Sequence, residues 1–175
     1  MAQALDPFVK ESPAPGDFHD SRLPPLLAYW ERERGDAELP PVAAIDPTRL
    51  TFILGWLMIM EPVDGGADFL YRLYGSNVAA AFGRDLTGCR VGDSFPEVAQ
   101  FVIAAYQRML ALRRPLLTRH RPPPVIPLDY WERLLLPFAA ADGTVTRILV
   151  GTIAHGVRKV GRRPLPWPLA KAATG

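Results

Sequence analysis

The sequence contains a single cysteine, Cys89, among its 175 residues. One cysteine excludes an intrachain disulfide and any cysteine-rich zinc or iron–sulfur site, and we expect no metal site. The most hydrophobic stretch, residues 52–60, has the length of a strand and falls short of the ~18–20 apolar residues that a membrane helix needs. Residues 1–20 lack the apolar segment of a signal peptide. We therefore expect a cytoplasmic protein with no membrane partner.

Recognisable catalytic motifs are also missing. The sequence has no glycine-rich phosphate loop, no G-x-S-x-G motif and no histidine pair at metal-binding spacing. Apart from Asp129 at the first position of a predicted strand, Glu61, Asp68 and Glu132 are the only acidic residues in the predicted strands. We expect that the protein is not an enzyme. The alternative is a small cone-shaped α+β hydrolase or isomerase, which would require one of these three carboxyl groups to be buried in a pocket.

Acidic residues are absent after Gly156, where five basic residues occur. Residues 1–155 contain 15 basic and 18 acidic residues, a net charge of −3, although the whole chain has a net charge of +2. A DNA-binding domain has a positive folded surface, so we expect no nucleic-acid partner. Proline-rich ends predict a disordered lead-in over residues 1–20, one domain over 21–158, and a basic tail over 159–175.

The remaining sequence alternates between helical and strand patterns. An apolar stripe at i, i+3, i+4 and i+7 predicts an amphipathic helix from about Leu23 to Gly35. Strand patterns cover residues 56–63, 68–74, 116–121, 129–139 and 145–157, and helical patterns cover residues 46–55, 78–82 and 96–112. Two strands before the helices and three after them predict an α+β fold: a five-stranded antiparallel sheet with helices on one face, plus the N-terminal amphipathic helix.

Short motifs carry a family resemblance. They are Leu27-Ala-Tyr-Trp30, Pro40-Pro41, Ile45-Asp-Pro47, Tyr71-Arg-Leu-Tyr-Gly75, Gly83-Arg-Asp-Leu-Thr-Gly88, Leu135-Leu-Pro137 and Asp142-Gly143. In their order and spacing, residues 26–157 resemble a family of short, single-domain bacterial PAS proteins. The resemblance implies a sensory or protein-interaction module of bacterial signalling that binds a small ligand or a partner protein. No output domain is recognisable, so we expect it to act in trans.

The resemblance also implies a ligand position between the long helix and the sheet. The candidate pocket residues are Met58, Met60, Tyr71, Arg72, Phe101, Ala105, Tyr106, Met109 and Ile153. The same residues are equally consistent with an ordinary packed core. The cofactor is unknown. Haem and covalent flavin are disfavoured, because the long helix has no histidine and Cys89 lacks the sequence context of a photoactive flavin site.

Two surfaces could bind other partners. Arg113, Arg114, Arg119 and Arg121 follow the long helix in a stretch without acidic residues, which predicts an anion site or simply a solvated loop. The stripe of the N-terminal helix could pack on its own sheet or on a second copy. We expect a homodimer through this stripe, which consists of Leu23, Leu26, Leu27 and Trp30.

Overall fold

In the computed structural model, which describes residues 7–158, six strands form one antiparallel sheet in the order β1-β4-β5-β6-β2-β3. The strands are β1 (Phe8–Glu11), β2 (Leu57–Val63), β3 (Asp68–Tyr74), β4 (Leu116–His120), β5 (Tyr130–Ala139) and β6 (Val145–His155). The helices are α1 (Leu23–Arg34), α2 (Ser76–Phe82) and α3 (Pro96–Leu112). The expected α+β fold is confirmed, with one strand more than the five predicted.

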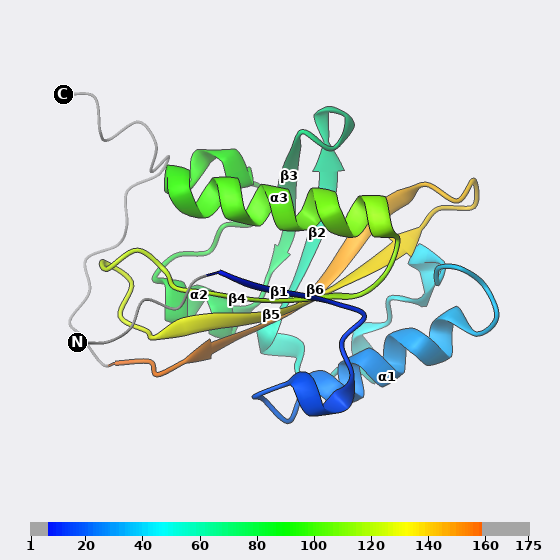
Figure 1. Cartoon of the computed structure of the whole chain (residues 1–175), viewed down its shortest axis with the longest axis horizontal. Helices are drawn as coiled ribbons and strands as arrows, with labels where there is room; N and C mark the ends of the chain where they lie inside the picture. Colours follow the sequence, from blue (N-terminus) through cyan, green and yellow to red (C-terminus); the bar gives the residue numbers. More distant parts are fainter. Residues whose placement is uncertain (1–6, 159–175) are drawn as a thin grey trace.

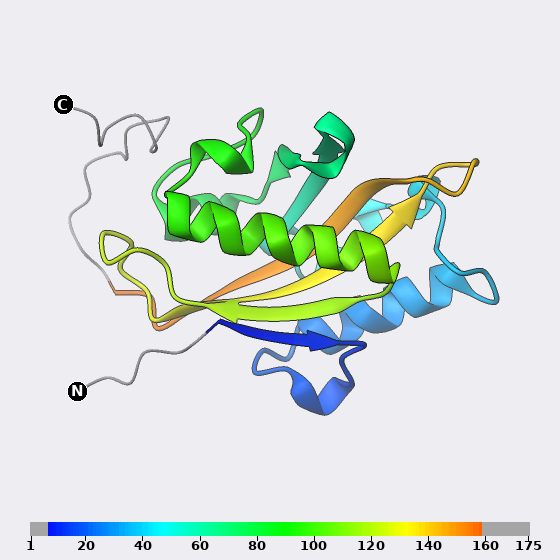
Figure 2. The ribbon, with the colours of Figure 1, turned by 45° about the horizontal axis from the view of Figure 1, so that its top comes forward.

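Helix α3 covers one face of the sheet, as predicted, and the N-terminal helix α1, whose position the sequence left open, covers the other (Figures 1 and 2). Because side chains alternate along a strand, neighbouring residues of β5 enter different layers. Trp131 and Arg133 face α3, and Glu132 and Leu134 face α1.

The apolar stripe of α1 is buried within its own chain. Leu23 and Leu26 are fully buried, and Leu27 and Trp30 are nearly so. Gly151 of β6 permits this contact, because a Cβ atom there would lie 2.6 Å from Leu26 Cδ2 and 2.8 Å from Leu23 Cδ2. The apolar stripe is therefore already removed from water by the sheet of its own chain, and it offers no exposed apolar surface to support the expected homodimer.

Residues 8–20 are ordered, contrary to the prediction of a disordered lead-in. Strand β1 pairs with β4 and becomes the edge of the sheet (Figure 2). The pairing is antiparallel, with Phe8 opposite Arg119 and Glu11 opposite Leu116. All four β1 residues are exposed. The strand therefore lacks the alternating apolar pattern by which strands are recognised in a sequence.

Most other predicted elements are confirmed within one or two residues. The exception is the helix expected over residues 46–55, where two separate 3₁₀ turns occur, Pro47–Arg49 and Leu54–Trp56. Helix α3 ends where Arg113 adopts a left-handed conformation (φ 54°) two residues before Pro115. The predicted basic tail, residues 159–175, lies outside the described residues. Within residues 7–158, no helix is both long and apolar enough to cross a membrane.

The close approach of α1 to β6 gives a test of the fold. We expect Gly151→Val to lower the free energy of unfolding by about 1–3 kcal/mol, because the added methyl groups would overpack two buried leucines. Gly16→Val is the control, since no atom lies within 4 Å of its added Cβ. In the control, the free energy of unfolding measured by urea denaturation should change by less than about 0.5 kcal/mol. Equal effects of the two substitutions would contradict the docking of α1 on β6.

Candidate functional site

A small cavity of about 40 Å³ lies between the sheet and the helices α2 and α3. Each of the strands β2 to β6 contributes at least one side chain to its wall. The strand residues of the wall are Met58, Tyr71, Tyr74, His120, Trp131, Arg133 and Thr152. The cavity thus lies at the centre of the five-stranded part of the sheet, on the face covered by α3.

Polar side chains cross the sheet beside this cavity. Arg133 on β5 is paired with Thr118 on β4 and with Thr152 on β6. The Arg133 Nε donates to Thr118 Oγ1 over 3.3 Å, and the guanidinium carbon lies 5.2 Å from the centroid of the Tyr106 ring. All three residues of the row are at most 4% exposed. The layer under α3 is therefore not a purely apolar core.

Several polar atoms here have no hydrogen-bond partner within the described protein. They are Arg133 Nη2, Thr152 Oγ1, His120 Nδ1 and Tyr106 OH. Buried polar atoms in folded proteins are nearly always paired, and each unpaired one costs about 1–3 kcal/mol. The concentration of such atoms around one cavity distinguishes this region from ordinary core.

Burial also sets the charge of the cavity wall. Burial, with the nearby charge of Arg133, holds the pKa of His120 well below its usual value. Burial raises the pKa of Tyr71, Tyr74 and Tyr106. The imidazole and the phenols are therefore neutral at pH 7, whereas an arginine stays protonated. Arg133 is the one charged residue among those lining the cavity.

The predicted pocket residues are distributed over three environments. Met58 and Tyr71 line the cavity, and the adjacent core contains Met60, Ala105, Tyr106 and Met109. The structure places the other three outside it. Phe101 lies in a surface depression beside His120, Ile153 faces α1, and Arg72 is exposed and paired with Glu61.

The four arginines predicted as an anion site contact different parts of the molecule. Arg113 pairs with Glu38 at 2.9 Å, and Arg114 lies in a neighbouring surface depression. Arg119 pairs with Glu132 on the α1 face, and Arg121 lies near the loop that follows β4. They do not converge on one site, because Arg113 and Arg114 precede β4, Arg119 points from β4 to the α1 face, and Arg121 follows β4.

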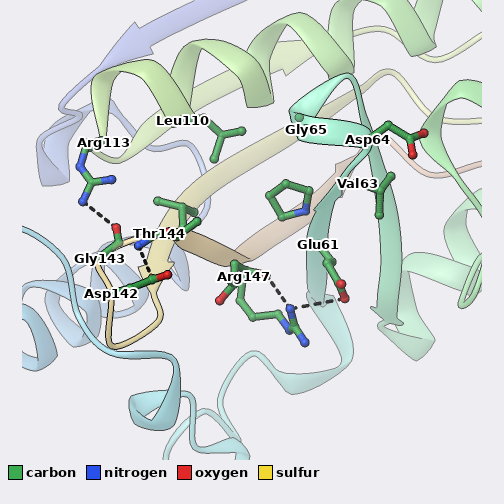
Figure 3. A pocket seen from close by; sticks show the side chains of 14 residues that line it. Glu61, Val63, Asp64, Gly65, Leu110, Arg113, Asp142, Gly143, Thr144 and Arg147 are labelled. Atoms are coloured by element: carbon green, nitrogen blue, oxygen red, sulfur yellow. Dashed lines mark hydrogen bonds and ion pairs between the residues drawn. The ribbon is translucent and has the colours of Figure 1, made fainter.

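A larger depression of about 780 Å³ opens on the surface between the β2–β3 turn, the end of α3 and the β5–β6 turn (Figure 3). Several of its polar groups are satisfied within the chain. Arg113 Nη2 donates to the Gly143 carbonyl over 3.0 Å, and Arg147 pairs with Glu61 at 3.4 Å. This groove is wide and solvent-exposed, and it lacks the unpartnered buried groups of the cavity.

Glu132 is fully buried, yet its carboxylate is saturated with hydrogen bonds. Its Oε1 accepts from the His19 amide at 2.9 Å and from Arg119 Nε at 3.0 Å. Its Oε2 accepts from the Asp20 amide at 3.1 Å and lies 3.1 Å from His155 Nε2. Both oxygens fix the segment that follows β1 to the sheet. Because Glu132 lies on the α1 face, away from the cavity, its burial does not support the enzyme alternative.

Sequence reasoning missed Arg133 and Thr152 and assigned His120 only to the arginine-rich segment. One signal was available for Arg133: an arginine inside the strand Tyr130–Ala139, whose other positions, apart from Glu132, are aromatic, aliphatic or proline. Such a charge needs either a partner or a function. Thr152 gave no comparable signal, because threonine is common in strands.

Comparison with known proteins gives a family and structural neighbours. A family model described as a PAS domain matches residues 19–154. Among solved structures, a sensory box sensor histidine kinase from Vibrio cholerae has 15% sequence identity and a TM-score of 0.47. The alignment covers 62% of this chain and 90% of that chain. Among curated proteins, none matches this sequence.

The lowered pKa of His120 predicts a dependence of stability on pH. The unfolded state binds the proton at its ordinary pKa of about 6.5, whereas folded His120 resists protonation, so acidification favours unfolding. We expect the free energy of unfolding to fall by about 1 kcal/mol more in the native protein than in His120→Gln between pH 7.5 and 5.5. Urea denaturation at both pH values measures this difference. Parallel pH profiles would contradict a neutral, buried His120.

The Glu132 contacts predict that the N-terminal segment depends on one carboxylate. We expect Glu132→Gln to destabilise the fold by about 3 kcal/mol, because Arg119 would lose its partner in a buried ion pair. Glu61→Gln is the matched control, since Glu61 is also an ion-paired strand carboxylate but is partly exposed, where it pairs with Arg72 and Arg147. Its cost should stay near or below about 1 kcal/mol. Hydrogen exchange should show faster opening of β1 in Glu132→Gln alone.

Proposed function

Because this chain belongs to the PAS domain family, whose members are sensory modules of signalling, we propose that it senses a small polar molecule in the cavity beneath α3. Binding there would be passed to a partner protein. The molecule would occupy the space between the central strands and the first half of α3. The binding residues would be Arg133, His120 and Thr152, with Met58 and Tyr71 as apolar and aromatic wall.

The observation that carries this proposal is the set of buried polar atoms without protein partners. A core that served only stability would place apolar residues there, because buried polar atoms without hydrogen-bond partners lower the free energy of unfolding. In natural proteins, buried polar groups without partners are concentrated at functional sites. The polar atoms of Arg133, His120 and Thr152 that lack partners belong to three adjacent strands and line one cavity.

The same strands suggest how occupancy would reach a partner. Thr118 and Arg133 lie on the face of the sheet beneath α3, while their neighbours Arg119 and Glu132 face the opposite layer and fix the N-terminal segment. A molecule that moves Arg133 therefore acts on the two strands that hold β1 and the turn after it. The edge strand β1 is exposed, so a change in its position is accessible to another protein.

A cavity-filling substitution tests the location of the site. We expect Thr152→Ile to abolish retention of a small molecule by the protein purified from its own host, because the added carbons would occupy the cavity. The matched control is Thr146→Ile on the same strand, because Thr146 lines the surface depression instead of the cavity. Mass spectrometry of the denatured protein measures the retained compound.

Three results would contradict the proposal. One is retention of the same compound by Thr152→Ile. Another is its loss from Thr146→Ile alone, which would place the site in the surface groove. The third is the absence of any retained compound together with no thermal stabilisation of the native protein by a library of small metabolites.

A further inference from the structure

We infer that the molecule recognised in the cavity is a small carboxylate or a comparable planar oxyanion, bound by the guanidinium group of Arg133. The inference rests on the proposed function and adds the chemical class of the ligand. Four observations carry it: the burial of Arg133, its lack of an acidic partner, the polar residues beside it, and the size of the cavity.

Arg133 is a buried cation without an anion. Arg133 is only 4% exposed, and its guanidinium group forms no ion pair with an acidic residue of the described chain. Its protein contacts are the Thr118 hydroxyl and the face of the Tyr106 ring. A neutral hydroxyl and an aromatic face stabilise a cation only in part. Burying an unpaired charge is among the most unfavourable arrangements in a protein interior.

The other buried ionic site of the sheet shows how this chain compensates charges. Glu132, the neighbour of Arg133, receives hydrogen bonds from Arg119 and two backbone amides. The same strand thus contains one buried charge with a complete set of partners and one without. Because a guanidinium group has donors only, a ligand at Arg133 would have to accept hydrogen bonds, and a negative charge on that ligand would compensate the unpaired buried cation.

The geometry of the missing group follows from the donors. Arginine binds carboxylates and similar oxyanions through two parallel N–H groups, which suits a planar ligand. Thr152, directly opposite Arg133 in the sheet, offers a hydroxyl without a partner. His120 offers a further unpaired nitrogen from β4. Neither carries charge at neutral pH, so the wall has one positive charge for the ligand to neutralise.

The cavity volume limits the ligand to a few atoms. About 40 Å³ exceeds the roughly 10–15 Å³ that one water needs, and accommodates about three water-sized groups. Pockets for drug-sized molecules begin near ~300 Å³. A monocarboxylate of the size of formate or acetate matches both the volume and the charge.

Isosteric probes separate charge from shape. Thermal unfolding would be followed with formate against formamide and with acetate against acetamide, at constant ionic strength set with chloride. We expect at least one of the two anions to raise the midpoint of the native protein with the logarithm of its concentration, by about 5 °C or more at about 100 times its Kd. The neutral amides, which have nearly the same shape, should leave it unchanged.

Variants of Arg133 separate binding from general salt effects. In Arg133→Met we expect the anion response to vanish, while the protein without anion is as stable as the native form or melts higher by a few degrees, because an unpaired buried charge is removed. Arg133→Lys keeps the charge and should retain a weaker response, which covers the case in which Arg133→Met fails to fold. Arg72→Met is the control, because Arg72 is an exposed arginine on the edge strand β3, away from Arg133, and should respond like the native protein.

The outcomes distinguish this inference from the proposed function. Equal stabilisation by amides and anions, or a full anion response in Arg133→Met, would overturn the oxyanion and leave a small-molecule site in place. So would a neutral compound retained by the native protein and lost in Thr152→Ile. No response to any probe, with no compound retained by the native protein, would overturn both.

Discussion

The pairing of Arg119 with Glu132 is the contact on which the arrangement of the N-terminal third depends. Glu132 lies near the start of β5 with no exposed surface, and its carboxylate also accepts from the amides of His19 and Asp20. This one group therefore joins β4, β5 and the segment between β1 and α1. Removing a carboxylate from water is costly unless its acceptors are filled, and here the acceptors are filled largely by the segment being held. The N-terminal segment and the charge in the sheet stabilise each other.

The alternation of β5 then decides what happens to the adjacent charge. Since consecutive side chains point to opposite faces, Arg133 is directed away from Glu132 and into the layer beneath α3. The two opposite charges of neighbouring residues cannot neutralise each other across the sheet. On the α1 face, the polar backbone of the incoming chain completes the site. On the α3 face, the helix supplies the apolar side chains Val98 and Val102. The chain offers Arg133 a threonine and an aromatic ring, which leaves its site incomplete.

The sequence predicted the elements that have a strong local signal. Helix α3 and strand β3 begin and end as predicted, because apolar periodicity and the flanking glycine or proline act within a few residues. Strand β1 was missed because all of its side chains are exposed and its order depends on the edge of β4 and on Glu132, more than 100 residues away. The face of the sheet that α1 covers could not be predicted either, because it depends on the contact of α1 with Gly151, which is also more than 100 residues away. For the site, Met58 and Tyr71 could be assigned to the interior from the fold type. Arg133 and Thr152 could not, because their significance lies in partners that they lack, and missing partners become visible only once the neighbours are placed.

An incomplete site at the centre of a sheet also accounts for how a small ligand could act on a whole domain. A molecule of three or four heavy atoms touches few residues, so its direct contacts alone give it little influence over the fold. Arg133, however, is hydrogen-bonded to β4 through Thr118 and lies opposite Thr152 on β6. The unpaired charge of Arg133 therefore destabilises the packing of three adjacent strands, β4, β5 and β6. A ligand that relieves this deficit stabilises the three strands together, and two of them hold the N-terminal segment from the other face. The response of the domain to the ligand would therefore depend on the unpaired charge of Arg133 in β5 more than on the number of contacts that the ligand makes.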